Sequence, residues 1–101
     1  MCYMKVHLQD GSTIVALCDS EHLGKILKEG EIVLDLKAYS SFYKGELVSE
    51  KEALAALRGA DSLNLVGKRS VALAGKLGLV AKGDVRTIGG VPHVQVYRIT
   101  R

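Results

Sequence analysis

The sequence contains few of the residues on which a disulfide framework or a membrane segment depends. Among 101 residues there are two cysteines, one proline and no tryptophan. Two cysteines are too few for a disulfide scaffold, which excludes the small secreted proteins built on one. No apolar run approaches the roughly 20 residues that span a bilayer, and Lys5 and His7 interrupt the first segment before a signal-peptide core could form. We therefore expect a cytoplasmic chain with no membrane partner.

The rest of the composition is that of an ordinary globular protein. Hydrophobic residues make up 48% of the chain and charged residues 25%, so it has enough apolar surface to fold, and disorder is not expected. A chain of 101 residues buries somewhat over half of its unfolded surface, and no linker or repeat divides this one. We expect a single domain over residues 1–101.

A β-hairpin is predicted at the start of the chain. Asp10-Gly11 is a strong turn signal between two apolar-rich segments. If it forms the turn, opposed residue numbers sum to 21, so Cys18 faces Tyr3 while Cys2 points to the other side of the sheet. This parity argues against a Cys2–Cys18 disulfide, and both thiols are expected to be reduced. The register also predicts one core-facing, apolar side and one wetter side. The apolar side holds Met4, Val6, Leu8, Val15 and Leu17.

A second hairpin is predicted at the end of the chain, over about residues 84–88 and 91–99, with its turn at Gly89-Gly90. Opposed numbers there sum to 179, which pairs Arg86 with His93 and Asp84 with Gln95. Pro92 has no backbone N–H to donate, so the side of its strand that faces away from the hairpin partner is expected to be a sheet edge or a bulge.

Helices and short strands are expected between the two hairpins. One helix is predicted over residues 20–29, because Leu23, Ile26 and Leu27 share a helical face that Asp19 or Ser20 can cap and Gly30 can end. The capping box Ser49–Glu52 opens a second helix, and a third is predicted over 68–77 with Gly78 as its left-handed cap. Strands are predicted near 32–36, 46–48 and 63–67. The predicted fold class is α+β, with a small antiparallel or mixed sheet, terminal hairpins and about three helices on one side.

Positive charge is concentrated in the second half of the chain. Residues 1–60 carry seven Lys or Arg against nine acids, whereas residues 61–101 carry seven against two. A basic half indicates a negatively charged partner, although the same excess is compatible with ordinary solubility.

The segment Gly67-Lys68-Arg69-Ser70 opens a predicted helix and could bind an anion there. Helix N-termini attract phosphate through free backbone N–H groups, and Lys68 and Arg69 would reinforce that attraction. The segment is not a nucleotide-triphosphate loop, since Ser62 stands where such a loop requires its first glycine. A generic phosphate or RNA-backbone contact and a simple solvated helix turn both remain open.

The outer face of the last hairpin is the other candidate. Arg86, His93 and Gln95 are predicted to share it, with Tyr97 next along the strand. A histidine beside an arginine could bind an anion or move a proton near neutral pH, or the face could simply be a solvated one.

Signals for catalysis, metal binding or a cofactor are weak. The histidines lie on separate segments with no cysteine or carboxylate at metal-ligand spacing, so no metal site is predicted. Cys18 and His22 are four residues apart, but no third group orients them, so no catalytic residue is assigned. The aromatic residues Tyr39, Phe42 and Tyr43 could stack on unpaired bases, but core packing is the favoured interpretation.

Three stretches of this sequence resemble an archaeal family of uncharacterised proteins, domain of unknown function 424. The first comprises Ala16-Leu17-Cys18-Asp19, Leu23-Gly24-Lys25 and Glu29-Gly30-Glu31; the second, Asn64 to Val71 and Leu77 to Val80; the third, Ile88 to His93 with Gln95 and Tyr97. The resemblance implies a small cytosolic protein with no established activity and no catalytic residues to carry over. It also implies an association with translation and ribosome-related proteins.

These observations favour a non-catalytic protein that binds RNA or a ribonucleoprotein linked to translation, with no cofactor. The predicted contacts are Lys68, Arg69, Arg86 and His93 to phosphates and Gln95 and Tyr97 to bases. Two alternatives are a protein–protein module that adds a strand at the Pro92 edge, and a small enzyme centred on His93.

Overall fold

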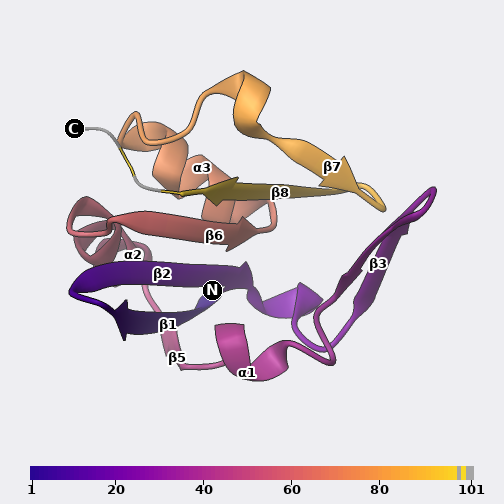
Figure 1. Ribbon diagram of the computed structural model, residues 1–101, viewed down its shortest axis with the longest axis horizontal. Helices are drawn as coiled ribbons and strands as arrows, with labels where there is room; N and C mark the ends of the chain where they lie inside the picture. Colours follow the sequence, from indigo (N-terminus) through magenta and orange to yellow (C-terminus); the bar gives the residue numbers. More distant parts are fainter. Residues whose placement is uncertain (98, 100–101) are drawn as a thin grey trace.

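The computed structural model describes residues 1–97 and residue 99, and its centre is a mixed six-stranded sheet (Figure 1). Two cations in the basic half of the sequence, Arg98 and Arg101, lie outside the described residues, as does one position of the predicted last strand. The strand order is β5-β1-β2-β6-β8-β7, and β3 and β4 form a separate two-stranded sheet.

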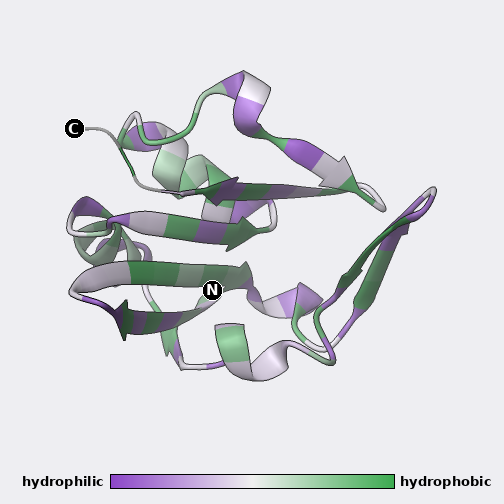
Figure 2. Ribbon diagram, in the orientation of Figure 1, coloured by the Kyte–Doolittle hydropathy of each residue, from purple (hydrophilic) through white to green (hydrophobic). Residues whose placement is uncertain are grey.

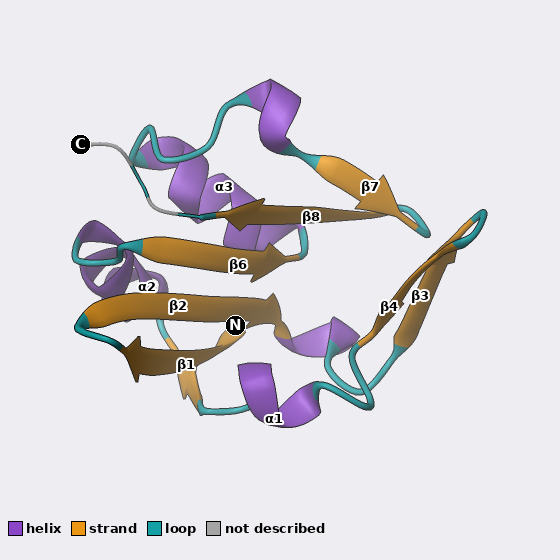
Figure 3. Cartoon of the chain, in the orientation of Figure 1, coloured by secondary structure: helices purple, strands orange, loops and turns teal. Residues whose placement is uncertain are grey.

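The strands are β1 (Cys2–Gln9), β2 (Ser12–Asp19), β3 (Ile26–Glu29), β4 (Ile32–Asp35), β5 (Glu46–Val48), β6 (Ser62–Val66), β7 (Arg86–Ile88) and β8 (Val91–Val96). The α-helices are α1 (Ser40–Tyr43), α2 (Glu50–Arg58) and α3 (Lys68–Lys76), with 3-10 turns at Ser20–His22 and Lys82–Asp84. The predicted α+β class, with a mixed sheet and terminal hairpins, is confirmed (Figure 3).

Both terminal hairpins have the predicted register. Tyr3 lies opposite Cys18 in β1–β2, and Arg86 lies opposite His93 in β7–β8. The backbone at Asp10 has φ 51°, a left-handed conformation that Asp tolerates in a tight turn. The two hairpins belong to one sheet because β6 lies between them, parallel to β2 and antiparallel to β8.

Apolar side chains pack on both faces of the sheet. On one face, α2 and α3 cover a core that includes Val15, Leu17 and Leu65, and in Figure 1 these helices lie behind the sheet. On the other face, α1 and β4 cover Ala16 and Cys18, so the prediction that the helices lie on one side of the sheet is wrong. Strand β2, coloured mainly hydrophobic in Figure 2, is therefore buried on both sides in its second half.

Burial on both faces corrects the predicted division of the first hairpin into a core side and a wetter side. The two distal residues of the apolar side, Val6 and Leu8, are 47% and 80% exposed and do not belong to the core under α2 and α3.

The predicted helix over residues 20–29 is wrong. Only a 3-10 turn forms at Ser20–His22, and β3 pairs with β4 around Gly30. Gly24 has φ 86°, which ends the turn, and its N–H donates to the Leu36 carbonyl rather than within a helix. The residues that matched a helical face also alternate as a strand does, and pairing with a later segment decided between the two patterns.

Two details of the last hairpin also differ from the prediction. Asp84 lies in the 3-10 turn before β7 and accepts a hydrogen bond from the Ala81 N–H, so it does not pair with Gln95. Pro92 does not mark a sheet edge, because β8 lies between β6 and β7. The missing N–H is tolerated since β6 pairs with β8 only as far as His93, and the Pro92 carbonyl accepts from Gly67.

The other predicted helices are confirmed. Ser49 and Glu52 form the reciprocal capping box of α2. At the end of α3, Gly78 has φ 69°, and the Leu79 N–H donates to the Ala74 carbonyl, the bond of a Schellman cap. Among the described residues, no helix has both the length and the apolar character needed to cross a membrane.

The two cysteines are free, as the parity argument predicted, and both are buried. Cys2 belongs to the core under α2 and α3, and Cys18 to the core on the opposite face. Burial is the main cause that raises the pKa of Cys18 to about 12, so this thiol is protonated at neutral pH and is not an activated nucleophile.

Candidate functional site

The start of α3, one of the two predicted anion sites, is occupied by a side chain of the protein itself. The Asp19 carboxylate accepts hydrogen bonds from the Arg69 N–H at 3.0 Å and the Ser70 N–H at 2.9 Å. The Ser70 hydroxyl also donates to Asp19, at 2.7 Å. All three side-chain and backbone donors therefore point at a buried carboxylate that ends β2. A phosphate cannot use these N–H groups while Asp19 holds them.

Gly67 makes this arrangement possible. A Cβ atom at this position would lie 2.2 Å from Cγ of Asp19, and the backbone there has φ 107°, which side-chain-bearing residues rarely adopt. Glycine is thus required for the close approach of Asp19 to the helix start, rather than for a phosphate-binding loop.

The side chains of Lys68 and Arg69 still face a surface depression of about 440 Å³. It is lined by Asp19, Glu21, His22, Lys68, Arg69, Gly90, Val91 and Pro92. Asp19, Glu21 and His22 bring their ligand atoms within 4.8 Å of one another, a cluster that their sequence spacing did not indicate. Arg69 is the cation paired with these carboxylates: its guanidinium lies 2.7 Å from Glu21 and 4.0 Å from Asp19.

The predicted face of the last hairpin forms part of a groove of about 310 Å³ between α1 and the strands β6 and β8. We call this the aromatic groove. It is lined by Leu34, Tyr39, Phe42, Tyr43, Asn64, His93 and Gln95. Its floor is the sheet face opposite α2 and α3, which the short α1 and the β3–β4 hairpin cover only in part (Figure 1).

The three aromatic residues of the groove have different roles. Tyr43 is 3% exposed and belongs to the core, as predicted, whereas Tyr39 is 64% exposed. Phe42 is half-buried and stacks on the His7 ring with 4.4 Å between ring centroids. The His7 ring nitrogen Nε2 lies 2.8 Å from the Phe42 carbonyl, which fixes this pair against the sheet.

Hydrogen bonds fix the polarity of the groove floor. The Tyr43 hydroxyl donates to Oδ1 of Asn64 at 2.5 Å, which turns the Asn64 NH2 group, a donor, away from that bond. Nδ1 of His93 lies 3.0 Å from the Leu65 carbonyl, which can only accept. Nδ1 therefore carries the proton, and Nε2 of neutral His93 is an acceptor.

The neutral state of His93 is favoured by its surroundings. Burial is the main cause that lowers the pKa of His93 below its ordinary value. The bond to the Leu65 carbonyl opposes this, and the nearby charge of Arg86 lowers the pKa further. A neutral acceptor suits the N–H groups of a base better than the oxygens of a phosphate.

The structure brings together only some of the six predicted contact residues. His93 and Gln95 line the aromatic groove, and Arg86 is the cross-strand neighbour of His93. Lys68 and Arg69 line the neighbouring depression, which includes Pro92. Tyr97, 76% exposed, lines a different hollow near the first hairpin turn.

Sequence reasoning missed the other polar residue of the groove floor. Asn64 lies between two leucines in a buried strand, and a polar residue in such a run was the available signal. Asp19 was considered only as a cap for a helix that does not form. Its true partner begins 49 residues later, at Lys68, and no local pattern links the two.

A mixed sheet with its two longer helices on one face and a polar, aromatic groove beside the short α1 on the other defines a small α+β protein with one partly open sheet face. The family model described as "Protein of unknown function (DUF424)" matches residues 7–99, and the chain belongs to this family. The resemblance seen in the sequence is thereby confirmed.

A solved structure has the same fold. The crystal structure of an uncharacterized conserved protein from Methanopyrus kandleri is 26% identical in sequence, with a TM-score of 0.78. The match covers 99% of this chain and 93% of that chain. A search of curated proteins found no match.

Replacing Asp19 should destabilise the fold more than losing an ordinary helix cap. Asp19→Ala leaves the Ser70 hydroxyl and two N–H groups without their acceptor, and we expect a loss of about 3 kcal/mol or more in the free energy of unfolding. Asp19→Asn keeps one acceptor oxygen and should lose about half as much. Urea unfolding followed by circular dichroism measures both. Equal, small losses in the two variants would contradict this role of the carboxylate.

The lowered pKa of His93 should make the fold less stable in mild acid. As pH falls below about 6.5, the unfolded chain takes up a proton on His93 before the folded chain does, so unfolding is favoured. The loss should level off below the folded-state pKa. The amide of His93→Asn can replace the Nδ1 donor but does not titrate. This variant should therefore lack the part of the pH dependence of the free energy of unfolding that comes from His93. Urea unfolding of both proteins from about pH 8 to 5 tests it, and parallel stability curves would contradict it.

Proposed function

We propose that this protein is a non-catalytic, cytoplasmic RNA-binding protein whose aromatic groove takes unpaired bases of RNA or of a ribonucleoprotein. The observation that carries the proposal is the groove itself. It combines an exposed aromatic ring, a stacked aromatic pair and polar side chains on an open sheet face. The link to translation that the family resemblance implies is part of the same proposal.

Stacking supports single-stranded rather than duplex RNA. Proteins recognise single strands by stacking unpaired bases on aromatic side chains, and they read base edges with short polar groups. Tyr39 offers an exposed ring on one wall, and Asn64 and Gln95 are cross-strand neighbours on the floor. A base stacked on Tyr39 could be read by the NH2 group of Asn64 and the amide of Gln95.

The charges around the groove suit a phosphate backbone. Lys37 and Lys44 flank α1, and Arg86 lies beyond His93 on the neighbouring strand. Among the described residues, the ion pairs use only Arg69 and Lys76 as cations, so those three side chains keep their charge available. Lys68 extends the basic surface toward the neighbouring depression.

The tautomer of His93 changes the role that was predicted for this residue, a contact to phosphate. Neutral Nε2 accepts a hydrogen bond, so we assign His93 to a base edge rather than to a phosphate. The groove lining given above includes no serine or cysteine that His93 could activate, so the geometry favours binding over the alternative of an enzyme centred on His93.

Binding of a fluorescent single-stranded RNA of about ten nucleotides, measured by anisotropy, tests the proposal. Affinity should fall as salt rises, because counterions are released on binding. Tyr39→Ala should weaken binding about tenfold through lost stacking. Arg86→Ala should weaken it and reduce the salt dependence.

The control is Lys51→Ala, which removes an exposed cation from α2 on the opposite face of the sheet. The proposal would be contradicted by an RNA affinity that does not change with salt concentration. It would also be contradicted if Lys51→Ala weakened binding as much as Arg86→Ala does. Equal affinity for duplex RNA would contradict the role of unpaired bases.

A second candidate function is association through a sheet edge. The Pro92 side is not an edge, but β1 is partly one: β5 pairs only with its first residues, up to Met4. Beyond that point no described strand pairs with this edge of β1, and two side chains of the same segment, Val6 and Leu8, are exposed on one face. An edge strand with exposed apolar side chains favours pairing with another strand. The edge could pair antiparallel with β1 of a second copy.

Light scattering after size-exclusion chromatography tests this second candidate. Wild-type protein should form a dimer as concentration rises, and Leu8→Lys should shift it to monomer, because a lysine on an edge strand opposes pairing. Leu8 is exposed, so the substitution leaves the core intact. A wild-type protein that stays monomeric throughout, or a dimer that Leu8→Lys leaves unchanged, would exclude it.

A further inference from the structure

Three polar side chains stand in a defined order on the floor of the aromatic groove. His93 and Gln95 are two residues apart on β8, so they lie on the same face of the sheet. Asn64 of β6 lies directly opposite Gln95 and shares that face. Gln95 is therefore the neighbour of both other residues, and His93 and Asn64 occupy the two ends of the set.

The two ends have opposite hydrogen-bonding character. Oδ1 of Asn64 accepts from the Tyr43 hydroxyl, which leaves the NH2 group of Asn64 as a donor. Nδ1 of His93 donates to the Leu65 carbonyl, which leaves Nε2 as an acceptor. Gln95 is exposed, and its amide can turn to present either its oxygen or its NH2 group. The order along the floor is thus acceptor, then either, then donor.

Both end groups are open to a ligand. The NH2 group of Asn64 and Nε2 of His93 have no hydrogen-bond partner among the residues that the structure describes. No fully buried polar side-chain atom in the same part of the chain lacks a partner, so these two atoms are accessible from the groove. A ligand that covers them displaces their water and must supply a donor at one end and an acceptor at the other.

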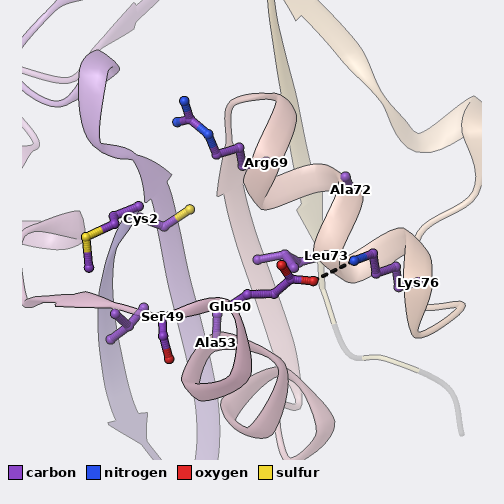
Figure 4. A pocket seen from close by; sticks show the side chains of 10 residues that line it. Cys2, Ser49, Glu50, Ala53, Arg69, Ala72, Leu73 and Lys76 are labelled. Atoms are coloured by element: carbon purple, nitrogen blue, oxygen red, sulfur yellow. Dashed lines mark hydrogen bonds and ion pairs between the residues drawn. The ribbon is translucent and has the colours of Figure 1, made fainter.

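The pocket on the opposite face of the sheet, between α2 and α3, offers no such set (Figure 4). Its interior is formed by buried apolar side chains such as Val48 and Leu73. Its polar side chains are already engaged within the protein, and these are Cys2, Ser49, Glu50, Arg69 and Lys76. Unsatisfied groups that could read a base are therefore a property of the groove.

The four bases of RNA differ in the order of groups along their pairing edge. Cytosine presents a donor, an acceptor and an acceptor, and guanine presents an acceptor, a donor and a donor. Each of these two bases therefore has a donor at one end and an acceptor at the other. Uracil has acceptors at both ends, and adenine has a donor, an acceptor and then a C–H group that makes no strong hydrogen bond.

We infer that the aromatic groove selects an unpaired cytosine or guanine. The donor end of either base meets Nε2 of His93, its acceptor end meets the NH2 group of Asn64, and Gln95 turns its amide to match the middle group. Uracil and adenine each leave one of the two end groups without a partner, which costs affinity. The inference rests on the proposed RNA-binding function and names the bases that the groove takes.

The bases are compared with fluorescent RNAs of about ten nucleotides, titrated at about pH 7.5, where His93 is neutral. Oligocytidine should bind about tenfold more tightly than oligouridine or oligoadenosine, the effect of one hydrogen-bonding group left unpaired. An RNA of alternating uridine and guanosine should also bind more tightly than oligouridine. Replacing cytosine by 2-pyrimidinone, which lacks the exocyclic amino group, should remove the advantage of oligocytidine.

The reading of the acceptor end is tested with Asn64→Asp. This variant keeps the oxygen that Tyr43 uses but replaces the NH2 donor by an acceptor, so the ratio of oligocytidine to oligouridine affinity should fall from about ten toward one. Ser41→Asp is the matched control, because it adds the same charge at an exposed position of α1 outside the groove lining. It should weaken both RNAs alike and preserve the ratio.

Three outcomes would overturn the inference. They are equal affinities for oligocytidine and oligouridine, a 2-pyrimidinone RNA that binds as tightly as oligocytidine, and a ratio that a folded Asn64→Asp variant leaves unchanged. RNAs that bind equally but lose affinity on Tyr39→Ala would leave the proposed function standing without this base preference. If none of the RNAs binds, the proposed function and the inference both fall.

Discussion

The hydrogen bonds of one buried carboxylate determine how the two faces of this molecule are built. Asp19 ends β2 and receives the first N–H groups of α3, and this contact ties the helix to the sheet where the parallel strands β2 and β6 both end. Carboxyl ends of parallel strands are where α/β proteins commonly bind anionic ligands. Here the protein supplies the anion itself. An external ligand cannot use these backbone N–H groups, so it must be bound by side chains or on another surface.

The two faces of the sheet differ because the elements that cover them differ. On one face, two nine-residue helices bury a continuous core. On the other, α1 is a single turn, and the β3–β4 hairpin projects to one side (Figure 3). Part of that face therefore stays open, and polar side chains occupy it. The aromatic groove results from this incomplete cover.

Local signals predicted local structure well, and long-range pairing decided the rest. Four local signals each act over a few residues, and the structure confirms all of them: the Asp-Gly turn, the two-glycine turn, the Ser49–Glu52 capping box and the Gly78 cap. The segment 20–29 failed because its pattern fits both a helix and a strand, and a partner strand decided between them. For the site, shared strand parity correctly placed His93 and Gln95 together, but Tyr43 reaches Asn64 only through tertiary packing.

The position of β6 has a consequence for how the chain folds. Each terminal hairpin can form from neighbouring residues within microseconds. Strand β6 must then pair with β2 on one side and β8 on the other, and Ile14 meets Ser62 only after the long intervening segment has closed. Closing such loops costs entropy before the contacts repay it. We therefore expect the entry of this five-residue strand to follow formation of the hairpins and to limit the rate of folding.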